Sequence, residues 1–232
     1  DYEKVASLLD GIKMLRDRNN CKMLRNMSGL PKVSRRTFDN FDVSRLSSAN
    51  KDMFEHLKSL SFLDTGFNVV IIGDPGTGKT HIAQAIGNLC CDKLYSTRYY
   101  KMAELEKKLK KAIENDKASS LLENLSKVSC LIIDEVGHCD PLNERESNLF
   151  FQILDNRYDK GKGSTVFTSN MKPSEWRPLF FNASVARCAL DRIMDRCIAI
   201  DIRGASYRGQ QKKVFKISTS SVPEVTGLNL YQ

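Results

Sequence analysis

The sequence predicts an α/β fold, in which a parallel sheet is covered by helices on both faces. Short apolar or β-prone runs alternate along the chain with stretches of helical periodicity. Most of these runs are continuously apolar, which is typical of strands buried on both faces of a parallel sheet. The chain has 232 residues, 41% of them apolar, which is enough for one large domain with a short appendage.

The predicted elements follow one another in a regular order. The expected strands are residues 67–72, 96–100, 128–133, 164–168 and 197–202. The expected helices are residues 81–89, 101 to about 127, 143–158 and 185–194. Strands that are separated by helices in this way predict parallel pairing.

The N-terminal region has a different character from the rest of the chain. Residues 1 to about 35 are polar and basic, with an apolar stripe at helical spacing that we expect to serve ordinary packing. The stripe comprises Val5, Leu8, Leu9, Ile12 and Leu15. Because Pro31 and the basic residues near position 35 indicate a linker, we expect three parts: a helical segment with its linker (1–36), the main domain (37–210) and a tail (211–232).

The most specific motif is GDPGTGKT, residues 73–80, which follows the first apolar run and precedes a helix. It matches G-x-x-x-x-G-K-[ST], the pattern of a phosphate-binding loop. The glycines let backbone N–H groups surround phosphate oxygens, and the helix directs the positive end of its dipole to the same point. We expect Lys79 to reach the β- and γ-phosphates of ATP and the Thr80 hydroxyl to bind Mg²⁺.

Polar residues follow the next two apolar runs. Asp134 is expected to hold Mg²⁺, as strand-end carboxylates do in enzymes with this loop. Glu135 beside it could polarise the attacking water, which predicts a hydrolase rather than a mere nucleotide binder. Asn170, in the segment TSN, could help to orient that water; a turn or helix-cap role fits its position as well.

These three motifs in this order resemble the AAA+ ATPases. The segments LKSLSFLDTGFNVVIIGDPGTGKTHIAQAIG, LIIDEVG, TSNMKPSEW, ALDRI and IRGASYR are similar to the IstB-like family, the helper ATPases of insertion-sequence transposition. DnaC-type helicase loaders are close relatives of that family. The resemblance covers residues 37–208 and implies a P-loop AAA+ fold. Only about 30 residues follow the last predicted strand, so no full C-terminal lid is expected.

The resemblance also implies roles for single residues. Lys79 and Thr80 match the Walker A pair, Asp134 and Glu135 match Walker B, and Asn170 matches sensor 1. The implied nucleotide-binding set is Gly73, Asp74, Pro75, Gly76, Thr77, Gly78, Lys79, Thr80, His81, Asp134 and Arg208.

Three arginines near the C-terminus are further candidates. Arg192 in LDRI falls where the family places the arginine finger, which completes the ATP site of a neighbouring protomer. Arg196 is the rival for this role, and Arg208 in SYR resembles a phosphate-sensing arginine motif. Each could instead form an ordinary surface salt bridge, which contributes little to stability.

The charge balance favours an anionic partner. Lys plus Arg number 36 against 28 for Asp plus Glu, a net charge of +8, and DNA is the leading candidate. The helical stretch 101–117 carries several of these lysines, which could contact DNA phosphates without sequence preference. Acidic residues interleave with the lysines, so a solvated helix face is an equal alternative. The lysines are Lys101, Lys107, Lys108, Lys110, Lys111 and Lys117.

Other features bear on the compartment. The seven cysteines include no C-x-x-C pair, and the three histidines have no zinc-site spacing, so free thiols in a reducing cytosol are expected. No leader sequence and no apolar run of membrane-spanning length occur, so we expect a cytoplasmic protein without a membrane partner.

Together, these features predict an ATP-dependent, DNA-binding helper ATPase that assists a transposase in target selection. It would form a homo-oligomer with ATP at the protomer interfaces. The alternative is a DnaC-type helicase loader with a replicative helicase as its partner. A nucleotide-binding scaffold without turnover is a third possibility, against which Glu135 and Asn170 argue.

Overall fold

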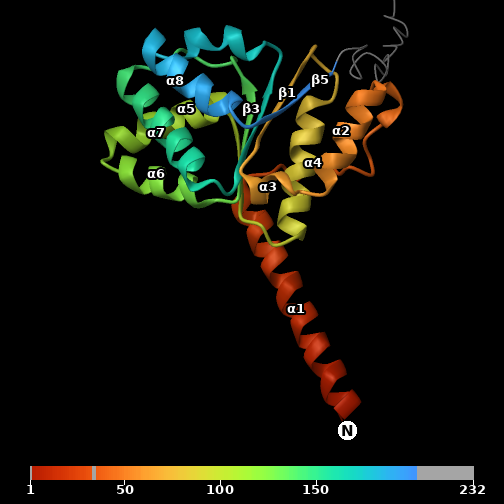
Figure 1. The fold of residues 1–232 in the computed structure, drawn as a ribbon. Coiled ribbons are helices and arrows are strands. Elements are labelled where there is room, and N and C mark those ends of the chain that lie inside the picture. The colour runs from red at the N-terminus through yellow and green to blue at the C-terminus, as the bar shows by residue number, and fades with distance from the viewer. Residues whose placement is uncertain (1, 33–34, 203–232) are drawn as a thin grey trace, which may run out of the picture.

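The computed structural model describes residues 2–32 and 35–202, which form a parallel five-stranded sheet with helices on both faces (Figure 1). The strand order is β2-β3-β4-β1-β5, and every neighbouring pair is parallel. The strands are β1 (Asn68–Gly73), β2 (Thr97–Lys101), β3 (Cys130–Val136), β4 (Ser164–Ser169) and β5 (Cys197–Ile202). The predicted fold class is confirmed.

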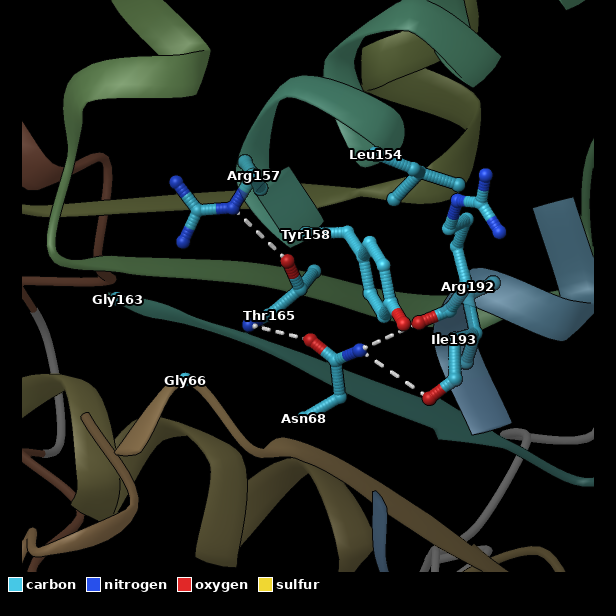
Figure 2. A pocket seen from close by; sticks show the side chains of 9 residues that line it. All are labelled: Gly66, Asn68, Leu154, Arg157, Tyr158, Gly163, Thr165, Arg192 and Ile193. Carbon is cyan, nitrogen blue, oxygen red and sulfur yellow. Dashed lines mark hydrogen bonds between the residues drawn. The ribbon is translucent and has the colours of Figure 1, made fainter. Parts of the chain in front are cut away.

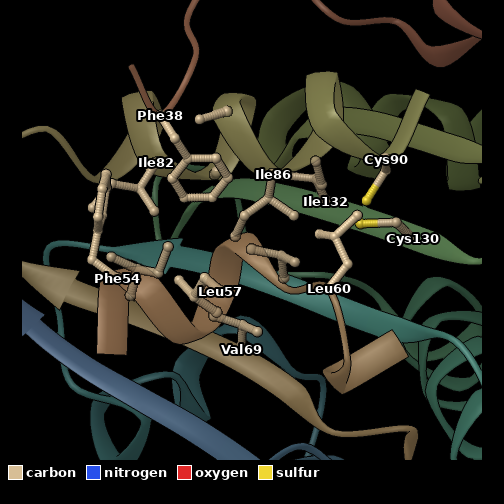
Figure 3. Packing of buried hydrophobic residues seen from close by; sticks show 14 of the residues in the cluster. Phe38, Phe54, Leu57, Leu60, Val69, Ile82, Ile86, Cys90, Cys130 and Ile132 are labelled. Carbon is tan, nitrogen blue, oxygen red and sulfur yellow. The ribbon is translucent and has the colours of Figure 1, made fainter. Parts of the chain in front are cut away.

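The sheet separates two hydrophobic cores, because successive side chains of a strand point to opposite faces. On β3, Cys130 and Ile132 join one core, whereas Leu131 and Ile133 join the other. Figure 3 shows the first core, where α4 packs over the strands. It is covered by α2 (Ser48–Lys58), α3 (Phe62–Thr65) and α4 (Lys79–Asp92). The second is covered by α5 (Met102–Glu114), α6 (Ala118–Lys127), α7 (Glu144–Lys160) and α8 (Ala183–Met194).

The N-terminal helix α1 (Tyr2–Ser28) is attached only by its C-terminal end and extends away from the sheet (Figure 1). At its base, Arg25 donates hydrogen bonds to Asn88 (2.6 Å) and Asp92 (2.5 Å), both in α4. Arg35 forms an ion pair with the same Asp92. We expected the apolar stripe of this helix to serve ordinary packing. That prediction is wrong for the described chain, because all five side chains are between 55% and 66% exposed.

Two details of the helices differ from the prediction. The single helix expected over 101–127 is two helices, α5 and α6, separated at Asp116, whose φ of 53° ends the first one. The helices α2 and α3 were not predicted, because their polar residues conceal the few apolar side chains that they bury, such as Phe54 and Leu57. Three short 3₁₀ helices complete the described fold: η1 (Val43–Arg45), η2 (Pro173–Glu175) and η3 (Arg177–Leu179).

In the described ranges, no helix is both long enough and apolar enough to cross a membrane. The tail expected at 211–232 and the motif that contains Arg208 lie outside the described residues.

Candidate active site

The glycine-rich loop connects the end of β1 to the start of α4, as the sequence predicts. Gly73, Gly76 and Gly78 all have positive φ angles, between 82° and 144°. At Gly73 a side chain is excluded outright, because a Cβ atom there would lie 2.0 Å from the carbonyl oxygen of Ile202 on β5. The loop therefore has a backbone conformation that requires glycine at these positions. Its N–H groups lie next to the N-terminus of α4.

Lys79 begins α4 and is almost fully buried. Its ammonium group folds back over the loop and donates hydrogen bonds to the carbonyl oxygens of Gly73 (2.8 Å) and Asp74 (2.7 Å). These bonds satisfy the buried charge while stabilising the loop. The ammonium group thus lies at the mouth of the loop, within the region where phosphates would bind.

Asp134 lies at the centre of a buried hydrogen-bond network. Its carboxylate is completely buried and accepts hydrogen bonds from three hydroxyl groups. Thr80 donates to Oδ1 at 2.9 Å, Tyr99 on β2 donates to Oδ2 at 2.6 Å, and Thr168 on β4 also donates to Oδ1. Burial, and then the carboxylate, raises the pKa of the Tyr99 phenol far above its ordinary value, so this hydroxyl remains a donor. Asp134 and Thr80 are therefore in direct contact.

Glu135 is adjacent to Asp134 but faces a different environment. A bulge in β3 falls between Ile133 and Val136, and Glu135 has a φ of 62°. Its backbone N–H donates to the Thr168 hydroxyl (3.0 Å), so one threonine side chain contacts both acidic residues. The carboxylate of Glu135 turns outward and forms an ion pair with Lys101 at 3.0 Å. This contact raises the pKa of the Lys101 ammonium group.

Asn170 follows the end of β4 and lies near the turn after β3. Its Nδ2 atom is 2.9 Å from Nε2 of His138. The buried hydroxyl of Ser169 joins the two segments, because it donates to the carbonyl of Val136 (2.7 Å) and accepts from the indole of Trp176 (3.2 Å). The ends of β3 and β4 are therefore held in a fixed relative position.

An open cleft of about 790 Å³ connects these groups. Its walls are the glycine-rich loop, the start of α4, the ends of β3 and β4, and the segment before α2. The following side chains line it from these elements: Lys79, Thr80, His81, Glu135, His138, Thr168 and Asn170. Arg36, Asn40, Phe41 and Asp42 line it from the segment before α2.

His81 fixes that last segment to α4. Its Nε2 atom lies 3.0 Å from the carbonyl oxygen of Thr37 and 2.9 Å from Oδ1 of Asn40. Both partners accept, so Nε2 carries the proton and donates. Burial lowers the pKa of His81, which favours the neutral ring. The residue therefore supports one wall of the cleft.

Sequence reasoning gave several residues of the site no role in ATP binding or hydrolysis. Of these, Arg36, Phe41, His138 and Thr168 line the cleft, whereas Tyr99 contacts Asp134 and Lys101 contacts Glu135. Tyr99 and Lys101 belong to β2, and only the strand order shows that β2 lies next to β3. The TSN segment was recognised, but the position of Thr168 within it carries no signal of its own. The basic residue Arg36 was interpreted as part of a linker, whereas its side chain lines the cleft.

Arg192 lies at the opposite edge of the sheet from the cleft, near the end of α8. It forms ion pairs with Asp155 (2.8 Å) and Asp191 (3.1 Å), and its guanidinium group lies 4.8 Å from the centre of the Tyr158 ring. Arg196 approaches the same ring at 5.4 Å. The structure therefore places both finger candidates on one patch, outside the chain's own cleft.

Figure 2 shows how this patch is built. The side chain of Asn68, the first residue of β1, donates to the carbonyl oxygens of Arg192 (3.2 Å) and Ile193 (3.1 Å). Arg157 behind it is fully buried and donates to the Thr165 hydroxyl (2.9 Å) and to backbone carbonyls. Burial lowers the pKa of Arg157 to about 10. The end of α8 is thus tied to the start of β1.

Comparison with known proteins identifies the family. The model of the family described as "IstB-like ATP binding protein" matches residues 2–214. The chain belongs to this family. Its IstB-like relatives include an ATP-binding protein named for insertion sequence IS232 of Bacillus thuringiensis subsp. berliner, 34% identical over 194 residues, which are 84% of this chain and 76% of the relative. A protein of the same kind from insertion sequence IS21 of Pseudomonas aeruginosa is 30% identical over 191 residues, 82% of this chain and 71% of the relative.

Solved structures confirm the fold of this IstB-like chain. AMPPCP-bound DnaA from Aquifex aeolicus superposes with a TM-score of 0.62 at 22% identity, over 75% of this chain and 51% of that one. The chain thus spans about half the length of that DnaA. The DnaC helicase loader superposes with a TM-score of 0.61 at 17% identity, over 73% of this chain and 97% of that one. At these identities the likeness shows the P-loop AAA+ fold alone. An IstB-like chain with this fold is an ATPase, and ATP is its nucleotide.

Proposed function

We propose that this IstB-like ATPase binds DNA, assembles on it with ATP at protomer interfaces, and assists a transposase in target selection. The observation that carries the proposal is the cleft, where the phosphate loop meets Glu135 and where Thr80 contacts the buried Asp134, in a chain whose relatives are named for insertion sequences. The cleft supports ATP hydrolysis, and the relatives support transposition as its setting.

The residues around Thr80 fit a magnesium ion. A hydroxyl and a carboxylate already lie 2.9 Å apart there, and oxygen ligands of this kind are the ones that Mg²⁺ prefers. We assign Thr80 and Asp134 to it. When bound with ATP, the ion would neutralise charge on the β- and γ-phosphates. The chain's own contribution to phosphate binding is Lys79, whose ammonium group would exchange its loop carbonyls for phosphate oxygens.

Glu135 is the proposed general base. It lines the open cleft at the end of β3, and its carboxylate is partly exposed. To accept a proton from water, Glu135 would leave Lys101, which costs little because an exposed ion pair is worth about 0–1 kcal/mol. Asn170, at the end of the neighbouring strand β4, would hold the same water by its amide.

Arg192 is the proposed finger for a neighbouring protomer. It cannot serve its own cleft, since β1, which separates the two sites, spans roughly 17 Å at about 3.3 Å per residue. Its partners in this structure are partly exposed carboxylates, from which a guanidinium group is easily released. A second copy of the chain could therefore receive Arg192 at its γ-phosphate. Arg196 on the same patch is the alternative.

The lysines of α5 are the proposed DNA contacts. α5 buries Met102, Leu105 and Leu109 and directs its lysines outward. Of the six lysines considered from the sequence, Lys101 is engaged with Glu135. Lys107, Lys108, Lys110 and Lys111 are exposed and form no ion pair with a described residue. The ammonium group of Lys108 lies 5.6 Å from the centre of the Tyr100 ring, and all four lysines remain exposed, so they could meet phosphates.

DNA binding with ATP present tests this part of the proposal. We expect sequence-tolerant binding whose affinity falls by about 10³-fold or more between 50 and 200 mM salt if several phosphates are contacted. Replacing Lys107, Lys108, Lys110 and Lys111 by glutamine should weaken binding and flatten the salt dependence. A matched control replaces four other exposed lysines, Lys51, Lys93, Lys162 and Lys172. Equal losses in the two variants, or no binding at all, would contradict the role of α5.

The alternative function is that of a DnaC-type helicase loader, and the fold likeness to the DnaC structure is the observation that favours it. Both functions use the same ATPase core, so the partner distinguishes them. The purified chain with ATP should capture the transposase of its own insertion sequence and not the replicative helicase of the same cell. Capture of the helicase alone would favour the loader.

A further inference from the structure

The turn after β3 brings a histidine into the cleft. It begins where the His138 N–H donates to the Glu135 carbonyl (3.1 Å) and passes through Gly137, whose φ is 92°. A Cβ atom at Gly137 would lie 2.7 Å from the sulfur of Met171, so the turn is seated closely against the segment after β4. His138 itself is exposed and lines the cleft beside Asn170. Its position is therefore built by the fold.

The contact between His138 and Asn170 fixes the direction of one hydrogen bond. Nδ2 of Asn170 lies 2.9 Å from Nε2 of His138. An amide nitrogen can only donate, so Nε2 accepts and the imidazole proton resides on Nδ1. Asn170 is thereby held with its other amide atom, Oδ1, turned away from the histidine.

We propose that His138 is a positioning residue for ATP hydrolysis, which acts by fixing the amide orientation of Asn170. The proposal rests on the function proposed above for Asn170. A water that gives one proton to Glu135 needs an acceptor for its second hydrogen, and Oδ1 provides one only in this orientation. If the amide turned over, Nδ2 would point at the water and Oδ1 at the imidazole.

Protonation of His138 would cause this inversion. The imidazolium ion donates from both nitrogens and no longer accepts, so Oδ1 of Asn170 would turn towards Nε2. Hydrolysis should therefore be slower on the acidic side, where the ring is charged. The other charged or titratable groups that line the cleft or share the turn are Arg36, Asp42, Lys79, His81, Glu135, Cys139 and Asp140.

The first test reads the tautomers directly, in the protein without nucleotide. The chain has three histidines, and His138 and His81 are expected in opposite forms. In a sample with ¹⁵N-labelled histidine at neutral pH, NMR should find the proton of His138 on Nδ1 and that of His81 on Nε2. The signals of His138 are identified by their loss in His138→Gln. A His138 ring protonated on Nε2 would overturn the proposal.

The second test separates positioning from a structural role. His138→Leu removes the acceptor and should lower kcat by about 3- to 10-fold, the usual worth of one hydrogen bond. Its affinity for a non-hydrolysable ATP analogue should stay within about twofold of wild type. His138→Gln supplies a side-chain oxygen that can accept from Nδ2, so it should recover most of the activity and lose the decline in kcat on the acidic side.

The outcomes distinguish this inference from the function on which it rests. Wild-type kcat and an unchanged pH profile in His138→Leu would overturn the role of His138 alone. Unaltered hydrolysis in Asn170→Leu would instead overturn the function proposed for Asn170, while the tautomer measurement would still decide whether His138 holds its amide.

Discussion

The adjacent residues Asp134 and Glu135 have contrasting surroundings. Asp134 is buried and held by three hydroxyl groups, whereas Glu135 reaches the open cleft and Lys101. Strand alternation directs Asp134 to the α4 side of the sheet, as it does Cys130 and Ile132, whereas the bulge and the positive φ of Glu135 interrupt this alternation at the next carboxylate. These surroundings suit the roles proposed above, Asp134 as a magnesium ligand and Glu135 as a general base.

Sequence reasoning anticipated part of this arrangement. The two acids and Lys79 were found because a strand-end motif and a glycine-rich loop have strong local patterns. Tyr99 and Lys101 were not, because their contacts depend on β2 lying beside β3, a fact of sheet order. Such partners become visible only when the topology is known.

The ion pair between Lys101 and Glu135 leads to a prediction about these two residues. The ion pair holds the carboxylate of Glu135 at Lys101, so it must break before Glu135 can reach the attacking water. Lys101→Met removes that restraint and keeps the length of the side chain. Basal ATP hydrolysis should rise by up to about fivefold, which corresponds to the roughly 1 kcal/mol that an exposed pair can contribute. Steady-state ATPase assays would measure the change.

The control is the same substitution in a Glu135→Gln background. With no carboxylate to release, Lys101→Met should then have no effect on the residual rate. An increase of the same size in both backgrounds would show that Lys101 acts on some other group.

At the scale of elements, β1 links two functional regions. Its C-terminal end leads into the phosphate loop, and its first residue, Asn68, contacts the end of α8. Asn68 also accepts a hydrogen bond from the N–H of Thr165 on β4 (3.1 Å). One side chain therefore joins β1, β4 and the segment that carries Arg192.

Asn68→Asp tests this junction. The substitution keeps the shape of the side chain and the acceptor for the N–H of Thr165. It removes the donor to the carbonyl oxygens of Arg192 and Ile193. It also places a negative charge at the C-terminus of α8, where the helix dipole makes it unfavourable. We expect a loss of about 1–3 kcal/mol in the free energy of unfolding, measured by urea denaturation. Asn115→Asp, at an exposed helix end, is the matched control. No difference between the two variants would contradict the role of Asn68 at this junction.

The elements also show where sequence patterns are insufficient. Most strands were predicted because short, continuously apolar runs between helical stretches are typical of a parallel sheet, whereas the break at Asp116 was not, since both flanking helices are amphipathic. The stripe on α1 has the periodicity of a packed helix, yet the described chain leaves it exposed. Periodicity indicates which face is apolar, and the tertiary structure decides whether it is covered.

At the scale of the whole molecule, the two halves of the proposed catalytic machinery lie at opposite edges of the sheet. The cleft with Lys79 and Glu135 lies at the carboxyl ends of the strands, and Arg192 lies near their amino ends. One chain alone therefore cannot bring Arg192 to its own ATP. Under the function proposed above, a second copy would supply Arg192, and hydrolysis would then depend on assembly.

Mixing two inactive variants tests this central claim most directly. Lys79→Ala lacks a competent ATP pocket but still offers Arg192, whereas Arg192→Ala has the pocket and lacks the finger. Each variant alone should hydrolyse ATP poorly. In Arg192→Ala the rate should fall by about 10³-fold if Arg192 behaves as arginine fingers do. Combined, they should regain part of the wild-type ATPase rate, because some interfaces join an intact pocket to an intact arginine. A mixture that co-assembles and remains as inactive as its components would contradict the claim that Arg192 acts between copies.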